Sequence, residues 1–471
     1  MTAAVEPVGQ HARVTSAVRP ALALLVAGAF FLENLDGTII ATAAPSMARA
    51  MGVPSSSIGI AMTAYLVTVA ALIPVSGWLA DRIGARTTFA AAITGFTVSS
   101  ALCAASTSLL ELTGMRVLQG AAGALMVPVG RLVVLRDTPK EQLIRVIAYL
   151  TWPALVAPIL APVLGGLCTT YLSWHWIFLI NVPLGVVALL AALRLVPDFA
   201  HTDPPALDWP GFLLSASALA TLTLEAALVS SSASTAVVEW VVAVVGVLAL
   251  VLAVRHLMRT RNPLVDLAAL RIQTFRVVHA GGSLFRVAVF GVPFLLPLLF
   301  QDVFHWSAVR AGAMVVFVFI GNLGIKPATS PLLRRFGFRT VICGAGAGTV
   351  VTLLLTGLLT PGTPGVLIAV LLVVGGAFRS IGFTGYNTIT FADVPPDEMV
   401  HANTLASTIQ QLAAGLAVSV AALALAAAQD WLGADGLTAY RLAFWFLAAL
   451  SAVAVAEAAR LPVDAGRAVT A

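Results

Sequence analysis

The stretch Arg82-Ile83-Gly84-Ala85-Arg86-Thr87 has a counterpart 253 residues later, Arg335-Phe336-Gly337-Phe338-Arg339-Thr340. Both copies follow a long apolar segment, and both place arginines on either side of a glycine. A short polar stretch repeated at this distance in a chain of 471 residues indicates a duplicated unit. Repeated halves with a binding site between them are common in secondary transporters. The repeat therefore predicts two equivalent halves.

The composition describes a chain that lies mostly in lipid. Hydrophobic residues make up 59% of the chain and charged residues only 10%, whereas soluble domains carry about 25% charged residues. The three cysteines, Cys103, Cys168 and Cys343, lie inside apolar segments, which argues against a disulfide framework or a zinc site. We therefore expect a polytopic membrane protein without a metal or other cofactor.

Apolar segments of about 20 residues, long enough to cross a hydrocarbon core of about 30 Å, occur fourteen times. They form a pattern of six, two inserted and six. The segments are Ala21–Ala44, Ile58–Leu79, Thr88–Thr107, Leu110–Val129, Leu143–Cys168, Ile177–Val196, Gly211–Val229, Val237–Leu257, Phe275–Phe300, Ala311–Ser330, Val341–Leu359, Gly365–Phe391, Asn403–Ala428 and Tyr440–Ala459.

This pattern divides the chain into five parts. We expect an N-terminal tail, a six-helix bundle, a linker with two inserted helices, a second six-helix bundle and a short C-terminal tail, at residues 1–20, 21–196, 197–274, 275–460 and 461–471. Most of the 26 Lys and Arg fall in loops on one side, including Arg131 to Arg145, and the other side holds only Arg49, Arg310 and Arg441. The positive-inside rule then places both termini in the cytoplasm, and it explains the net charge of +5 better than nucleic-acid binding does.

Two carboxylates stand in the first apolar segment, at Glu33 and Asp36. A charge at bilayer depth costs roughly 2.5 to 3.5 kcal/mol on insertion scales, so such residues face a wet cavity or a partner. Their spacing of three places them on one face of a helix. Arg116 in the fourth segment cannot deprotonate and needs a counter-ion, for which either carboxylate is a candidate. We expect a proton or cation site here.

Other intramembrane polar residues are candidates for a substrate cavity. They are Glu225, Arg286, Lys326, Arg379, Tyr386, Asn387, Gln410 and Gln411. The three cations in this set either pair with Glu33, Asp36 and Glu225 or form a site for an anionic substrate. The sequence leaves both alternatives open.

Several motifs resemble those of the major facilitator superfamily. The loop residues Gly77, Asp81, Arg82, Gly84 and Arg86 are similar to its signature between the second and third helices. Leu112, Arg116, Gln119 and Gly120 resemble a motif linked to proton transfer, and Pro158, Pro162, Gly165 and Gly166 resemble the antiporter motif of proton-driven exporters, with alanine at positions 157 and 161 in place of family glycines.

Two further stretches, Leu35–Ile40 and Trp174–Pro183, are similar to motifs of the fourteen-helix branch, the drug:proton antiporter-2 family, and within it to the MdtD-like members. This resemblance implies an all-α major facilitator fold in a bacterial plasma membrane, in a monomeric exporter that exchanges small molecules for protons. It makes Asp36 the leading proton-coupling residue, assisted by Glu33 and Arg116.

Other functions remain as alternatives. The intramembrane cations leave open the export of an anionic metabolite such as citrate or a metal–citrate chelate. A channel and an intramembrane enzyme are the remaining classes. Neither lysine, Lys140 or Lys326, ends a Gly-rich phosphate-binding loop, and Gly-x-Ser-x-Gly and His-Glu-x-x-His motifs do not occur. The sequence thus favours a carrier that is not driven by ATP.

Overall fold

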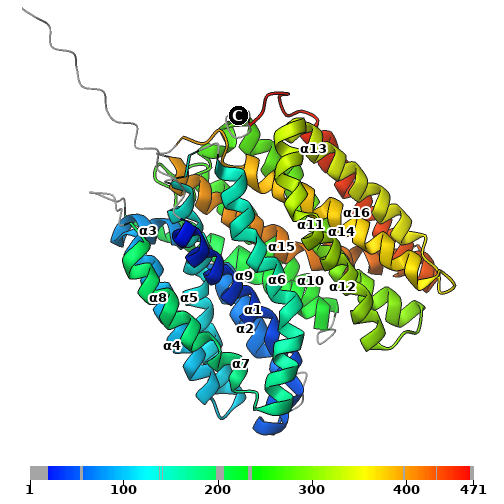
Figure 1. The fold of residues 1–471 in the computed structure, drawn as a ribbon, viewed down its shortest axis with the longest axis horizontal. Helices are drawn as coiled ribbons and strands as arrows, with labels where there is room; N and C mark the ends of the chain where they lie inside the picture. The colour runs from blue at the N-terminus through cyan, green and yellow to red at the C-terminus, as the bar shows by residue number, and fades with distance from the viewer. Residues whose placement is uncertain are drawn as a thin grey trace, which may run out of the picture.

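The fold is helical throughout the described chain (Figure 1), which comprises residues 20–53, 57–136, 138–139, 142–197, 206–231, 236–395, 398–430 and 432–466 of a computed structural model. The predicted N-terminal tail before Pro20 lies outside these residues. All fourteen predicted spans coincide with helical segments. Within the described ranges, eleven helices are long and apolar enough to cross a membrane, and α6, α9 and the shorter α12 complete the fourteen.

The first half contains the six predicted spans of the N-terminal bundle. The second span is divided into α2, the 3-10 turn η2 and α3, and the sixth into α7 and α8. The elements are α1 (Pro20–Met51), α2 (Ile58–Leu72), η2 (Ile73–Val75), α3 (Ser76–Ile83), α4 (Ala85–Ala105), α5 (Leu109–Arg136), α6 (Leu143–Tyr171), α7 (Trp176–Leu179) and α8 (Asn181–Leu195).

The inserted pair and the second half complete the chain. In this half a π turn, η5, extends the ninth span, and α13 contains a sharp bend at Gly337 that separates the tenth and eleventh spans. The elements are α9 (Trp209–Ser231), α10 (Ala236–Leu257), η4 (Ala268–Arg271), α11 (Gln273–Leu298), η5 (Leu299–Val303), α12 (Ala308–Gly324), α13 (Lys326–Gly357), α14 (Gly365–Ile389), α15 (Met399–Asp430) and α16 (Gly436–Ala458).

The backbone repeats at the offset that the sequence predicts. Gly84 and Gly337 both bend the chain with positive φ, at φ 89° and ψ 143° and at φ 75° and ψ 162°, a region that is essentially limited to glycine. The second helix of each half is also interrupted before a proline at the same offset, at Pro74 and Pro327. The duplication is therefore present in the geometry as well as in the sequence.

The inserted pair packs between the halves. Helix α9 contacts α2 of the first half and α15 of the second, and α10 packs on α9. On the outer side of α10, Val241, Val244 and Leu248 are more than half exposed, as expected for side chains that face lipid. Asp208 connects the start of α9 to the end of α10. Its carboxylate accepts hydrogen bonds from the Gly211 N–H at 3.0 Å and the Leu264 N–H at 3.2 Å, and it lies 2.8 Å from His256 Nε2.

The two halves meet on the side of the molecule that carries the termini. Figure 1 shows the start of α1 beside α3 at this end, and the end of the described chain, in red, near the start of α13. The Asn403 side chain of α15 donates to the Pro128 carbonyl of α5 at 2.9 Å. A Cβ atom at Gly77 of α3 would lie 2.0 Å from Thr404 Oγ1, so glycine permits this close approach. The structure is closed on the side of the termini.

Candidate substrate and proton site

Asp36 lies at the centre of a buried hydrogen-bonded network. Arg116 Nη1 on α5 donates to Asp36 Oδ2 at 2.5 Å, and both residues are at most 1% exposed. Oδ1 accepts from Gln119 Nε2 at 2.9 Å and from Asn181 Nδ2 at 3.0 Å. Both carboxylate oxygens therefore have donors. The counter-ion of Arg116 is Asp36, not Glu33.

The surroundings of Arg116 complete this network. Its guanidinium carbon lies 4.0 Å from the centre of the Tyr65 ring on α2, and its Nη1 also donates to Gln119 Oε1 at 2.6 Å. Gln119 Nε2 in turn donates to Ser100 on α4 at 2.7 Å. Asn181 is the first residue of α8, where the chain turns at Ile180. The network joins five helices of the first half.

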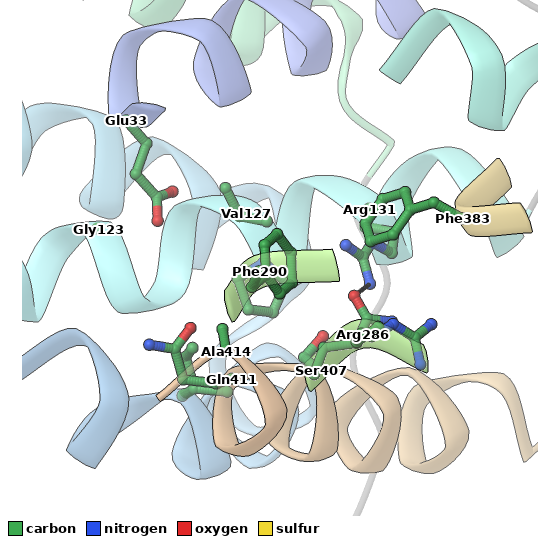
Figure 2. Close-up of a pocket in the computed structure, with 13 residues that line it drawn as sticks. Glu33, Gly123, Val127, Arg131, Arg286, Phe290, Phe383, Ser407, Gln411 and Ala414 are labelled. Atoms are coloured by element: carbon green, nitrogen blue, oxygen red, sulfur yellow. Dashed lines mark hydrogen bonds between the residues drawn. The ribbon is translucent and has the colours of Figure 1, made fainter. Parts of the chain in front are cut away.

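A second set of charged residues lines a cavity of about 190 Å³ between the two halves (Figure 2). Its walls come from α1, η2 and α5 of the first half and from α11, α14 and α15 of the second. The polar side chains that line it are Glu33, Arg131, Arg286, Ser407, Gln410 and Gln411, and the aromatic ones are Phe290 and Phe383. Asp36 does not line this cavity.

Glu33 and Arg131 are the charged residues of the first half that line this cavity. Glu33 Oε2 is buried and has no hydrogen-bond partner among the described residues, and its carboxyl group points into the space between the halves (Figure 2). Arg131 Nη1 donates to Gln410 Oε1 at 3.3 Å. The expectation that Arg131 lies in a loop is wrong, because α5 continues past Val129 to Arg136. Arg131 then shares a helix face with Gly123 and Val127.

Arg286 on α11 is the cation of the second half. It is 1% exposed, and its Nη2 donates to Asn387 Oδ1 at 2.9 Å. Its Nε and Nη1 are buried without partners among the described residues. The guanidinium carbon lies 5.9 Å from the centre of the Phe383 ring, which makes an edge contact with Phe290 at 6.0 Å. The 253-residue offset that relates the two loops also relates Glu33 to Arg286.

Five of the candidate residues do not line the cavity. Asn387, the partner of Arg286, is one of them. Lys326 Nζ donates to Thr384 Oγ1 at 2.7 Å, and Arg379 Nε donates to the Gly375 carbonyl at 3.1 Å. Glu225 of α9 accepts from Ser419 of α15. Tyr386 is buried against Phe285 and donates to the Ala454 carbonyl at 3.3 Å.

The alternative in which the C-terminal cations pair with acids is therefore wrong for the described structure. Arg286, Lys326 and Arg379 form no ion pair there with Glu33, Asp36 or Glu225. Their partners are a side-chain amide, a hydroxyl and a backbone carbonyl. Since these helices come from different parts of the bundle, segment order alone could not decide which charges would meet.

The loop and antiporter-like motifs have structural contacts. Arg86 donates to the Leu193 carbonyl at the end of α8, Asp81 is buried, and Arg82 is exposed. A Cβ atom at Gly165 would lie 1.9 Å from Thr42 Oγ1, so this glycine permits close packing of α6 on α1.

The rest of the antiporter-like motif has fewer described contacts. Gly166 has open space around it. Pro158 and Pro162 lie in α6, and their side chains fall outside the described part of the chain.

Comparison with known proteins gives concordant results. Residues 26–418 match the family described as Major Facilitator Superfamily. MdtD of Escherichia fergusonii, whose name describes a multidrug resistance protein, is 38% identical over 405 residues, which cover 85% of each chain. MdtD of Shigella flexneri shows the same identity and coverage.

Solved structures share the fold at lower identity. The human organic anion transporter MFSD10 is 17% identical, with a TM-score of 0.64 over 93% of this chain and 99% of that one. The proton:xylose symporter XylE is 15% identical, with a TM-score of 0.63 over 94% and 95% of the two chains.

Proposed function

Because this chain belongs to the major facilitator superfamily, we propose that it is a proton-coupled transporter that exports small molecules, as a multidrug:proton antiporter. The observation that carries the proposal is the cavity between the two halves, in which a carboxylate without a hydrogen-bond partner among the described residues faces space large enough for a small molecule. The MdtD relatives support the multidrug assignment through their names.

The cell location follows from the same reasoning. We place the protein in the plasma membrane of a bacterium, with both termini in the cytoplasm, where the positive-inside rule puts the basic loops. The side closed by the Asn403–Pro128 hydrogen bond is then the cytoplasmic side. We further propose that the protein works as a monomer.

We assign proton binding in the coupling step to Glu33, assisted by Asp36 and Arg116, which do not line the cavity. Glu33 lines the cavity, whereas both oxygens of Asp36 already accept hydrogen bonds from Arg116, Gln119 and Asn181. In the inward-open state Glu33 releases its proton and binds a cationic group. In the outward-open state a proton displaces that group. Exchange results because each ligand biases the same rocking equilibrium between the two states.

Purified protein in liposomes tests this assignment. An imposed pH gradient should drive ethidium accumulation by the wild type, and Glu33→Gln should reduce the initial rate at least tenfold, since glutamine cannot carry the proton. Glu457→Gln is the matched control, because Glu457 is a partly exposed carboxylate that pairs with Arg460 and does not line the cavity, and it should transport like the wild type. Undiminished gradient-driven transport by Glu33→Gln would contradict the coupling role.

Export of an anionic metabolite such as citrate is the second candidate function. It is favoured by Arg131 and Arg286, two cations in the cavity that are bound to amides rather than to carboxylates. Arg286→Gln should then slow citrate transport strongly and leave ethidium transport intact. The opposite pattern would support the polyspecific drug exporter.

A further inference from the structure

The cavity is electrically divided along its length. Figure 2 shows Glu33 at one end and Arg131 and Arg286 at the other, with Phe290 between them. Glu33 and Arg131 belong to the first half, and Arg286 belongs to the second. A ligand that spans this cavity therefore meets opposite charges at its two ends.

Each end has hydrogen-bonding capacity that the protein leaves unused. Glu33 Oε2 at one end, and Arg286 Nε and Nη1 at the other, are buried without partners among the described residues. Buried charged groups are stable when they are paired and hydrogen-bonded. An ammonium group of a ligand would pair with the Glu33 carboxylate. A carboxylate of the ligand would accept directional hydrogen bonds from the guanidinium groups of Arg131 and Arg286.

The middle of the cavity is apolar and aromatic. The edge-to-face pair of Phe290 and Phe383 forms one wall, and Phe290 is 39% exposed. Aromatic rings pack favourably against such pairs in offset or edge-on geometry. The wall therefore suits a flat ring between two polar ends.

Coupling to protons further restricts the ligand. An anion held by Arg131 and Arg286 binds better when Glu33 is protonated, so it would bind together with the proton rather than exchange for it. A simple cation at Glu33 competes with the proton but is repelled by both arginines. A ligand with a cationic and an anionic end competes with the proton at Glu33 and is attracted by the arginines.

The charges around Glu33 are consistent with competition between a proton and a cationic group at this carboxylate. Asp36 on the same helix is compensated by its ion pair with Arg116. Asp36 on α1 and Arg131 on α5 are the charged groups that act on Glu33, and Tyr65 on α2 is a further neighbour. The balance at the site is thus one acid against two guanidinium groups, neither of which forms an ion pair among the described residues.

On the premise of the transport function proposed above, we propose that the preferred substrates are compact aromatic zwitterions. The ammonium group binds Glu33, the ring lies against Phe290 and Phe383, and the carboxylate lies between Arg131 and Arg286. One half of the transporter holds the cationic end, and both halves hold the anionic end.

Three probes with one ring and different charges test the proposal. They are 4-(aminomethyl)benzoate, which is a zwitterion, 4-methylbenzylamine, which is a cation, and 4-methylbenzoate, which is an anion. We expect calorimetry on the purified protein to show at least tenfold tighter binding of the zwitterion than of either singly charged probe. Equal affinities for the three probes would overturn the inference.

Two variants assign the ends of the ligand. Glu33→Gln should weaken binding of the zwitterion and the amine at least tenfold and spare the benzoate. Arg286→Gln should weaken binding of the zwitterion and the benzoate and spare the amine. Glu457→Gln should bind all three like the wild type, and a parallel loss for all three probes in both variants would refute the assignment of the ends.

Transport measurements separate this inference from the function on which it rests. If a pH gradient drives ethidium transport but the zwitterion is bound no better than the amine, the zwitterion inference fails and the antiporter proposal stands. If the charge-specific binding pattern is found but a gradient drives no probe across the membrane, the antiporter proposal fails and the binding site stands.

Discussion

Replacing Asp36 by asparagine should destabilise the protein as well as impair its activity. The asparagine amide can take two orientations. In one, its NH2 group faces the donor Arg116 Nη1, and in the other it faces the donors Gln119 Nε2 and Asn181 Nδ2, so one donor always meets another. Arg116 is fully buried and loses its ion-pair partner. Removing one member of a buried ion pair costs about 3 to 5 kcal/mol, and we expect a loss of this size in the free energy of unfolding.

A double-mutant cycle measures this coupling directly. Arg116→Gln alone should also destabilise, since it leaves the Asp36 carboxylate buried without a cation. The double variant Asp36→Asn with Arg116→Gln removes both charges, so its loss should be smaller than the sum of the single losses by about 1 to 3 kcal/mol. Denaturant unfolding in detergent, followed by tryptophan fluorescence, gives the four free energies.

Glu33→Gln is the internal comparison for this cycle. Because Glu33 Oε2 has no hydrogen-bond partner among the described residues, its neutralisation should change the free energy of unfolding by less than about 1 kcal/mol. The structural reasoning is refuted if Asp36→Asn is as stable as the wild type and yet loses gradient-driven transport. Asp36 would then be the coupling residue, as its motif suggests.

Three other substitutions test packing and backbone geometry. Gly77→Ala places a Cβ atom 2.0 Å from Thr404 Oγ1, so it should open the closed side, seen as faster maleimide labelling of a cysteine introduced at Ser407, and Thr404→Ala should restore the wild-type rate. Gly337→Ala should destabilise by about 1 to 3 kcal/mol because of its positive φ, whereas Gly344→Ala, with open space around it, should be close to neutral in thermal unfolding. Asp208→Ala should cost about 1 to 3 kcal/mol at neutral pH. Burial opposes ionisation of Asp208, but the hydrogen bonds that it accepts outweigh this and lower its pKa. Its contribution to the free energy of unfolding is therefore full at neutral pH and is lost as the pH falls below about 4. A difference in unfolding free energy between the variant and the wild type that stays constant down to acid pH would contradict this.

The helices were predictable because each span is a continuous apolar run with polar residues at both ends. The repeated loop predicted the duplication, and Gly84 and Gly337 share a backbone conformation that requires glycine. The ends of the helices were less predictable. Hydropathy ends the fourth span at Val129, but α5 continues for almost two more turns to Arg136.

The site was harder to predict than the fold. Arg131 was missed for the reason just given, although the spacing of Gly123, Val127 and Arg131 placed all three on one face. Glu33 and Asp36 were expected to act together because they are three residues apart. Their environments differ, since Asp36 meets Arg116 and Asn181 from other helices while Glu33 faces the cavity.

The duplication relates the acidic and the basic end of the cavity to each other. Glu33 and Arg286 occupy equivalent positions on the first helix of each half, and both line the cavity. Equivalent backbone positions direct both side chains to the same space, but one residue is an acid and the other a base. Packing requirements would favour similar residues at two such positions. The opposite charges instead suit a ligand that carries both signs, because Glu33 of the first half then holds its cationic end and Arg286 of the second half helps Arg131 to hold its anionic end.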